Sequence, residues 1–202
     1  MPFIDTQLEH EMRRLESADL EVVGEMTKIS KATKRRRLIA VAILSDMERQ
    51  GRTLAVVVRP YAYEHMIIRG RVEIPTGFVT DFASIPSAVQ FLIQPFGRHA
   101  PAAVIHDYLY AIGADGRRKQ ADKVFLEAMK DNGVSFLRRS LMFRMVRWFG
   151  GKGYGLVEDW SFVDHETGAP VETALERPEI DYLTQDEFKA AKKAAKTATA
   201  KA

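Results

Sequence analysis

The spacing of apolar residues divides the middle of the chain into a β part followed by a helical part. Residues 53–79 are rich in β-branched and aromatic side chains, as in TLAVVVRPYAY and RVEIPTGFVT, and this composition is typical of strands. The second stretch also alternates polar and apolar residues. We therefore predict a β-hairpin or a small antiparallel sheet, with its turn near residues 64–70.

After these strands the apolar period becomes that of a helix. SAVQFLIQPF at 87–96 predicts a short helix. Pro101 suits the first turn of a helix over about 101–112, and Gly113 suits its end. A further helix is predicted over about 117–131, and SFLRRSLMFRMVRWFG predicts an amphipathic helix after it.

The fold class that follows is α+β, with a small antiparallel β-hairpin or sheet followed by a helical hairpin and an amphipathic helix. Helical spacing also predicts which side chains of the hairpin face the core. These are Ile105, Leu109, Ile112, Ala121, Val124, Phe125, Ala128 and Met129.

Composition divides the chain into four segments. Residues 1–50 form a partly helical N-terminal extension, and residues 51–155 form the core domain. Residues 156–187 are acidic and less periodic, with Trp160 and Phe162 expected to attach them to the core. The Ala/Lys-rich tail at 188–202 is predicted to be disordered.

The charge balance and the residue types exclude several classes of site. The chain has 202 residues and a net charge of +3, and it contains no cysteine. Disulfides, zinc–thiolate sites and cysteine nucleophiles are therefore excluded. The N-terminus lacks a basic-then-apolar signal, and the longest apolar run, LIAVAIL, is too short to cross a bilayer. We expect a soluble protein without an export signal of the usual kind.

The helical hairpin at 97–129 carries the candidate chemistry. Tyr110 follows His106 by four residues, so the two side chains share one helix face. Asp107 points about a third of a turn away. Asp122 begins the next helix, and the short link makes the two helices antiparallel neighbours. We expect Asp122 to be the hydrogen-bond partner of His106.

Two interpretations of this cluster stay open. In the first, His106 is a catalytic base that activates a water molecule, Asp122 orients it and Tyr110 supports it. Asp107 and Asp81 would then be available for a hard cation such as calcium, which would stabilise an oxyanion. In the second interpretation the same side chains form a structural network that specifies packing and catalyses nothing.

HDYLY resembles the H-D-x-x-Y signature of phospholipase A2 helices. In that family the His is the base, the next Asp binds calcium, and the Tyr hydrogen-bonds an Asp on the following long helix. The resemblance implies these roles for His106, Asp107, Tyr110 and Asp122. It is confined to this hairpin, because the flanking cysteines and the calcium-binding loop of that family are missing.

A longer resemblance covers about residues 53–150. VEIPTGFVTDFASIP, GRHAPAAVIHDYLY and ADKVFLEAM resemble the uncharacterised phage and prophage family DUF1353. The family implies a phage context and no established activity. We therefore expect the protein to act in the cytoplasm of a host cell or on a virion, with a phage structural protein, a host protein or membrane lipid as partner.

Three further polar residues, Asp81, Ser84 and His99, lie outside the helix face shared by His106 and Tyr110. Asp81 either caps nearby backbone amides in an Asx-type turn or reaches the His106 site. Ser84 lacks the sharp strand-to-helix turn that a serine nucleophile needs. His99 lies beside Arg98 at the start of a helix and is expected to be exposed.

The functional hypothesis is a hydrolase-like His–Asp centre that cleaves an ester or phospholipid bond, with calcium or another divalent cation as candidate cofactor. Its rival is a non-catalytic virion, tail or assembly protein in which the cluster is structural. The pattern disfavours nucleic acid as a partner and does not predict an oligomeric state.

The amphipathic helix carries a basic patch. Arg144 and Arg147 share one face and could join Lys130. Such a patch suits phospholipid or nucleic-acid phosphate. It equally suits the chain's own acidic segment at 158–187, an interpretation we prefer because it needs no partner.

Overall fold

The structure of the chain is a computed structural model. The chain divides into two units, residues 1–36 and 37–202, and the described residues all belong to the second. They are 39–49, 52–65, 67–82, 97–171, 176–184, 186–191 and 193. Predicted helices before residue 36 and at 87–96, Ser84 and most of the Ala/Lys tail lie outside them.

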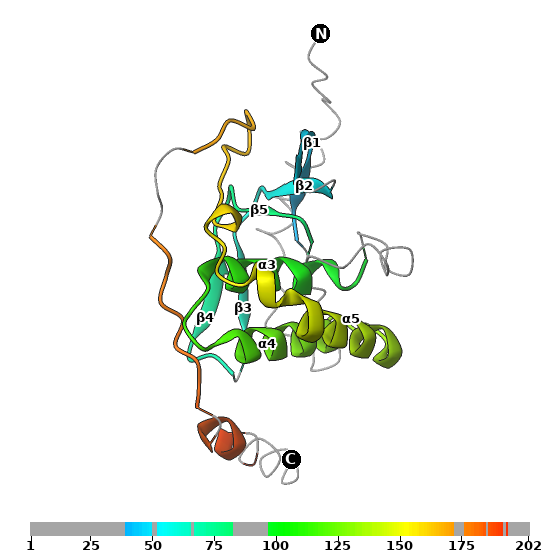
Figure 1. Ribbon diagram of the computed structural model, residues 1–202, viewed down its shortest axis with the longest axis vertical. Helices are drawn as coiled ribbons and strands as arrows, with labels where there is room; N and C mark the ends of the chain where they lie inside the picture. Colours follow the sequence, from blue (N-terminus) through cyan, green and yellow to red (C-terminus); the bar gives the residue numbers. More distant parts are fainter. Residues whose placement is uncertain are drawn as a thin grey trace, which may run out of the picture. The chain divides into compact units, whose positions relative to one another are not determined.

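The described strands form two small antiparallel sheets (Figure 1). One has the order β1 (Val41–Arg49), β2 (Arg52–Val57) and β5 (Val79–Thr80). The other pairs β3 (Tyr61–Glu64) with β4 (Arg71–Ile74), with Tyr61 opposite Ile74. The predicted hairpin is confirmed, and β1 adds a strand from within the segment at 1–50 to the sheet of the core domain.

Strand β2 is buried on both faces. Alternate residues of a strand point to opposite sides of the sheet. Ala55 and Val57 lie in the main core, whereas Leu54 and Val56 belong to a smaller apolar cluster with Val79 and Val163. The β1–β2–β5 sheet therefore separates two apolar clusters.

Among the elements whose bounds the structure describes, three α-helices follow the sheets, which confirms the α+β class. They are α3 (Ala100–Ile112), α4 (Arg118–Asp131) and α5 (Phe136–Phe149). Two short 3₁₀ helices, η1 (Gly150–Gly153) and η2 (Val157–Asp159), come next. No described helix is long and apolar enough to cross a membrane.

Helix α3 is the centre of the fold. Pro101 lies in its first turn, and Gly113 ends it with a left-handed φ of 65°. All residues of α3 except Asp107 are buried, and a helix that is apolar all round must be covered on every side. It contacts α4, β4, β5 and η2, and Figure 1 shows it between the β1–β2–β5 sheet and the α4–α5 pair.

The burial of α3 also corrects one expectation. His99 is 1% exposed rather than solvated, because it is the N-cap of a helix whose first turn is itself buried. Its ring lies back toward Gly97, where a Cβ atom would come within 3.2 Å of it. The core-facing residues predicted for α3 and α4 are all buried.

The acidic segment after α5 folds back onto the core. Phe162 forms an isolated bridge with Phe78, and Tyr182 forms one with Ile68. The rings of Phe78 and Phe162 also meet edge to face, with 5.7 Å between centroids. The predicted attachment through Phe162 is therefore confirmed.

Two glycines in the link after α3 provide a matched pair for testing how this helix ends. Gly113 and Gly116 have φ of +65° and +67°, so alanine is strained at either. A Cβ on Gly113 would lie 2.4 Å from Gly155 Cα, whereas a Cβ on Gly116 meets nothing within 4 Å. We expect Gly116→Ala to lower the free energy of unfolding by about 1–2 kcal/mol and Gly113→Ala to lower it more. Urea unfolding measures both, and equal losses would show that the contact between Gly113 and Gly155 does not matter.

Candidate functional site

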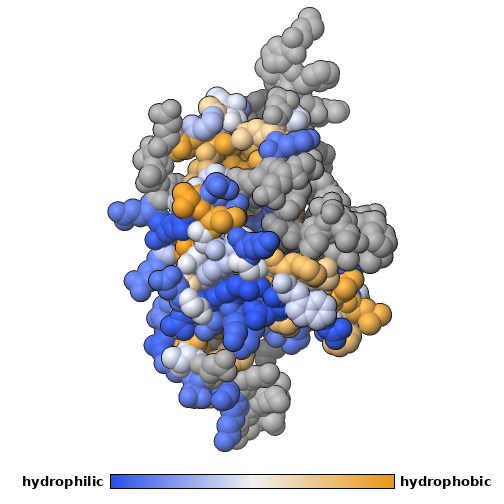
Figure 2. Space-filling view, in the orientation of Figure 1, coloured by the Kyte–Doolittle hydropathy of each residue, from blue (hydrophilic) through white to orange (hydrophobic). Residues whose placement is uncertain are grey.

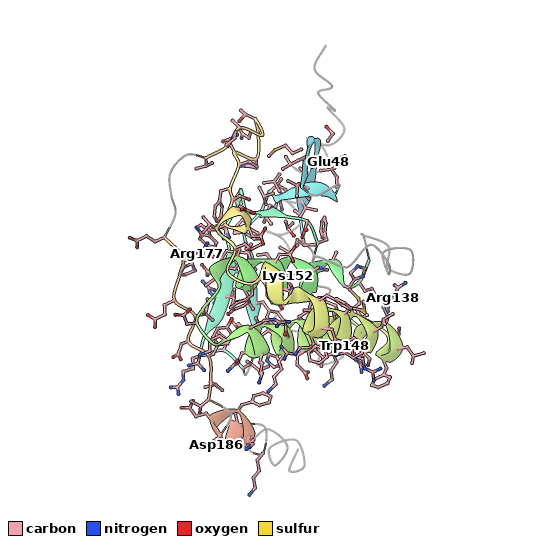
Figure 3. All side chains as sticks on the ribbon, viewed as in Figure 1. Glu48, Arg138, Trp148, Lys152, Arg177 and Asp186 are labelled. Atoms are coloured by element: carbon pink, nitrogen blue, oxygen red, sulfur yellow. The ribbon has the colours of Figure 1, made fainter. Side chains whose placement is uncertain are left out.

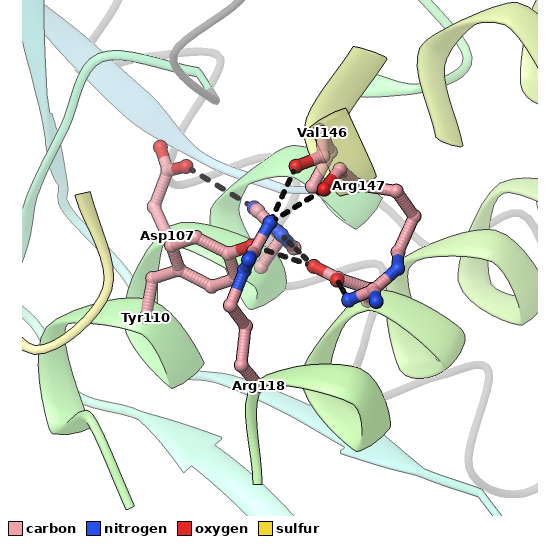
Figure 4. Close-up of polar contacts among 7 residues, drawn as sticks. Asp107, Tyr110, Arg118, Val146 and Arg147 are labelled. Carbon is pink, nitrogen blue, oxygen red and sulfur yellow. Dashed lines mark hydrogen bonds and ion pairs between the residues drawn. The ribbon is translucent and has the colours of Figure 1, made fainter. Parts of the chain in front are cut away.

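The structure brings together the three residues predicted for the catalytic cluster (Figure 4). His106 Nε2 lies 3.2 Å from Asp122 Oδ1, and the Tyr110 hydroxyl donates to the same oxygen at 2.7 Å. All three residues are buried, and Asp122 has no exposed surface. Because an ionised Asp122 can only accept, His106 carries a proton on Nε2.

Local sequence explains this placement. His106 and Tyr110 are one turn apart on α3, and their ring centroids lie 4.0 Å apart. The link between Ile112 and Arg118 is short, so α4 returns along α3 and its first turns face this pair. Asp122 is thus brought against the face of α3 that His106 and Tyr110 share.

Two arginines that were not predicted for the site complete it. Arg147 of α5 donates from Nη1 to Asp122 Oδ2 at 2.5 Å. Arg118 of α4 donates from Nε to the Tyr110 hydroxyl at 3.2 Å. Its Nη2 also donates to the carbonyl oxygens of Val146 and Arg147, at 3.1 and 2.8 Å. Arg118 therefore ties the last turn of α5 to the cluster.

The sequence held a signal for one of these arginines. Arg118 precedes Asp122 by four residues and so shares its helix face. Arg147 has no comparable signal, because its contact depends on how α5 crosses α4. The preferred interaction of the α5 arginines with the acidic segment at 158–187 does not hold for Arg147, which binds Asp122.

Asp107 lies on the other side of His106, at the edge of the buried region. Its side chain is 13% exposed, and its Oδ1 is 3.9 Å from His106 Nδ1. Thr80 of β5 donates to its Oδ2 at 2.5 Å and accepts from the Phe82 amide at 3.1 Å. Phe82 has a left-handed φ of 62°, which is rare for an aromatic residue. The strained turn after β5 therefore holds Thr80 against Asp107.

The cation roles expected of Asp107 and Asp81 stay predictions. Asp81 is half-buried, and it is the preceding residue, Thr80, that contacts Asp107. Within the described ranges, no three His, Asp or Glu side chains are grouped in a way that could hold a metal ion.

Burial, hydrogen bonds and neighbouring charges shift the pKa values of His106, Asp122 and Tyr110. Burial alone would lower the pKa of His106, but the facing carboxylates of Asp107 and Asp122 outweigh it and raise this pKa above 6.5. Burial alone would raise the pKa of Asp122, but its three hydrogen-bond donors lower it below 3.8. Burial and the bond to Asp122 raise the pKa of Tyr110. At neutral pH Asp122 is therefore ionised and Tyr110 is neutral.

The two nitrogens of His106 are in different situations. Nε2 is bound to Asp122, which is itself held by Tyr110 and Arg147. Nδ1 is buried and makes no hydrogen bond in the part of the chain that the structure describes. Its separation of 3.9 Å from Asp107 is beyond hydrogen-bond length. Within the trio of His106, Asp122 and Tyr110, Nδ1 is thus the position left for a further group.

Comparison with known proteins identifies one family. The model of the family described as a protein of unknown function, DUF1353, matches residues 55–146. The match covers 92 of the 202 residues. The predicted resemblance is confirmed, and the region includes His106, Asp107, Tyr110 and Asp122, while Arg147 lies just beyond it. No curated protein and no solved structure matches the chain.

The shifted pKa values predict a pH dependence of stability. The raised pKa of His106 means that its stabilisation is complete below pH 6.5 and is lost as the pH rises through the raised value. The lowered pKa of Asp122 means that its stabilisation is complete above pH 3.8 and is lost as the pH falls further. The cluster therefore stabilises the fold most between these two limits.

We expect the free energy of unfolding of the wild type to fall as the pH rises above 6.5 through the raised pKa of His106, and His106→Gln to flatten this decline. Urea unfolding at several pH values measures the effect. His165→Gln, at an exposed position, should keep the wild-type slope. The same decline in His106→Gln as in the wild type would mean that another group causes it.

Proposed function

We propose that the DUF1353 region is a hydrolase-like centre in which His106 acts as general base toward an ester bond. The observation that carries the proposal is the difference between the two ring nitrogens of His106. One is locked to a buried carboxylate, and the other makes no hydrogen bond among the described residues. A general base needs both: a fixed tautomer, and a nitrogen left to accept a proton.

Each residue of the cluster has its own role in the proposed hydrolysis. His106 Nδ1 removes a proton from a water molecule, whose oxygen attacks the ester carbonyl. Asp122 stabilises the imidazolium that forms, as the buried carboxylate does in a His–Asp pair. Tyr110 and Arg147 hold Asp122 in place through its two oxygens. The proton then passes from Nδ1 to the leaving alkoxide, which leaves as an alcohol, with the acid as the other product.

No step of this reaction runs through a cation. A calcium site of the phospholipase A2 kind would need Asp107 together with further oxygen ligands. The described residues do not assemble such a set, and Asp107 is already engaged by Thr80. Its carboxylate instead raises the pKa of His106.

That raised pKa sets the pH at which the centre would work. A protonated His106 cannot accept a proton, so the active form is the neutral imidazole. Its population grows as the pH rises through the raised pKa. Hydrolysis should therefore increase from neutral toward alkaline pH.

A specific observation favours the rival function, a non-catalytic phage component with a structural cluster. His106 is 3% exposed, so a water molecule or substrate reaches Nδ1 only if neighbouring side chains move. In this alternative the charged cluster holds α3, α4 and α5 in one arrangement. The setting that we propose is the same for both functions: a phage or prophage protein in the host cytoplasm or on a virion, with membrane lipid or another protein as partner.

We expect the purified protein to hydrolyse short-chain p-nitrophenyl esters, and His106→Gln to reduce kcat/KM by about 10²–10⁴-fold. Gln can still hydrogen-bond Asp122, so the fold should survive. The wild-type rate should rise with pH through an inflection above 6.5. Dispersed phospholipid, assayed by fatty-acid release, tests the finer substrate proposal.

The matched control is His99→Gln, another buried histidine at the start of the same helix, which should keep full esterase activity. If the wild type is no more active than His106→Gln on either substrate, the hydrolase proposal fails and the structural alternative replaces it. Equal losses in the two histidine variants would point to destabilisation of α3 instead of lost chemistry.

A further inference from the structure

Helix α5 presents an apolar surface to solvent. Leu137 is 80% exposed and Trp148 is 71% exposed, and Phe136 and Phe149 at the two ends of the helix are also mostly exposed. Large apolar side chains rarely gather on a free protein surface without a binding role. Figure 2 shows apolar side chains gathered at one end of α5, on the right of the view, next to hydrophilic ones.

Leu137 and Trp148 are exposed, and with the half-buried Leu141 between them they form a stripe that does not belong to the core clusters. Met142 and Val146 are the buried residues of α5 and lie one turn apart. Leu137, Leu141 and Trp148 are spaced i, i+4 and i+11, which places them on one line along the opposite face. We call these three residues the outer stripe. A surface helix normally turns its apolar stripe inward, so α5 has apolar residues on two faces.

The charge around the outer stripe has one sign. Residues 134–157 contain no Asp or Glu, and their basic residues are Arg138, Arg139, Arg144, Arg147 and Lys152. Arg144 lies within the line of the outer stripe, and Arg138 lies beside its N-terminal end (Arg138 and Trp148 are labelled in Figure 3). Of these cations, Arg147 is used internally by Asp122. The exposed face of α5 thus joins Leu and Trp side chains to positive charge that no acidic residue within 134–157 offsets.

We propose that the outer stripe of α5 docks on the surface of an anionic phospholipid membrane. A helix with arginines and with Leu, Trp and Phe side chains on its exposed surface suits the membrane interface, where the apolar groups enter the acyl boundary and the cations meet phosphate. Nucleic acid would use the arginines but would leave Leu137 and Leu141 without a partner. A second copy of the chain would cover the apolar residues but would bring the same cations face to face.

This inference does not depend on the proposed hydrolysis, because membrane docking requires only the exposed face of α5. The two proposals meet at Arg147, which lies on α5 and binds Asp122 of the cluster. The two proposals can still fail separately. If the protein binds vesicles without cleaving ester bonds, membrane docking holds and the proposed hydrolysis does not.

The test is vesicle co-sedimentation of the full chain with phosphatidylcholine vesicles that contain or lack phosphatidylglycerol. We expect binding to the anionic vesicles, weakened by added salt, and little binding to phosphatidylcholine alone. Trp148 is exposed in the free protein, whereas Trp160 is half-buried. The fluorescence of Trp148 should therefore shift to shorter wavelength on binding, and Trp148→Phe should remove most of that shift.

Two sets of variants assign the surface. Leu137→Ser with Trp148→Ser should weaken vesicle binding about tenfold or more, and Arg144→Gln should weaken it about fivefold. Ile43→Ser on β1 and Arg71→Gln on β4 remove an exposed apolar and an exposed basic side chain elsewhere, and should bind as the wild type does. Melting temperatures should stay close to that of the wild type, because none of these side chains is buried.

Four results would overturn the proposal. Absence of binding to anionic vesicles would do so, as would binding that Leu137→Ser with Trp148→Ser leaves unchanged. Concentration-dependent self-association in sedimentation velocity, abolished by that double variant without any vesicle binding, would assign the stripe to a second copy. Binding to duplex DNA or RNA in place of vesicles, lost in Arg144→Gln only, would assign the face to nucleic acid.

Discussion

Asp122 is an ionised carboxylate with no exposed surface, and the arrangement of the three helices depends on how it is compensated. Placing such a charge inside a protein costs several kcal/mol unless charges and hydrogen bonds offset the loss of water. Here the offset comes from donors on two other helices: His106 and Tyr110 of α3, and Arg147 of α5. Because all three must reach one carboxylate on α4, the rotation of each helix is restricted. Arg118 adds a second restraint by binding both Tyr110 and the last turn of α5.

The same constraint explains why His106 suits either proposed role. Asp122 determines which nitrogen of the imidazole carries a proton, and the opposing carboxylate of Asp107 helps to raise its pKa. This leaves Nδ1 on the side of Asp107, at the less buried edge of the cluster. A packing network and a general-base centre need this same fixed ring, and they differ in whether water reaches Nδ1. Thr80, held by the strained turn at Phe82, lies on that edge and contacts Asp107.

How much of this could be predicted from the sequence depends on how far apart the interacting residues are. The ends of α3 and α4 follow from Pro101, Gly113 and the apolar spacing, and the contact of His106 with Asp122 follows from a short link between two helices. Contacts that need a third element could not be predicted, since nothing local reveals how α5 crosses α4 or where β5 meets α3. Arg147 and Thr80 were missed for this reason. The burial of His99 was missed because local sequence does not show that all sides of α3 are covered.

The central claim is that Asp122 holds α3, α4 and α5 together, and a double-mutant cycle of Asp122→Asn and Arg147→Gln tests it most directly. We expect Asp122→Asn to lower the free energy of urea unfolding by about 3–5 kcal/mol. The two changes together should cost less than the sum of the single losses, because they remove one shared interaction of about 0.5–3 kcal/mol. Asp115→Asn, in the exposed link before α4, should stay within about 0.5 kcal/mol of the wild type. If Asp122→Asn also stays within that range, or if the losses simply add, Asp122 is not the constraint on which this structure depends.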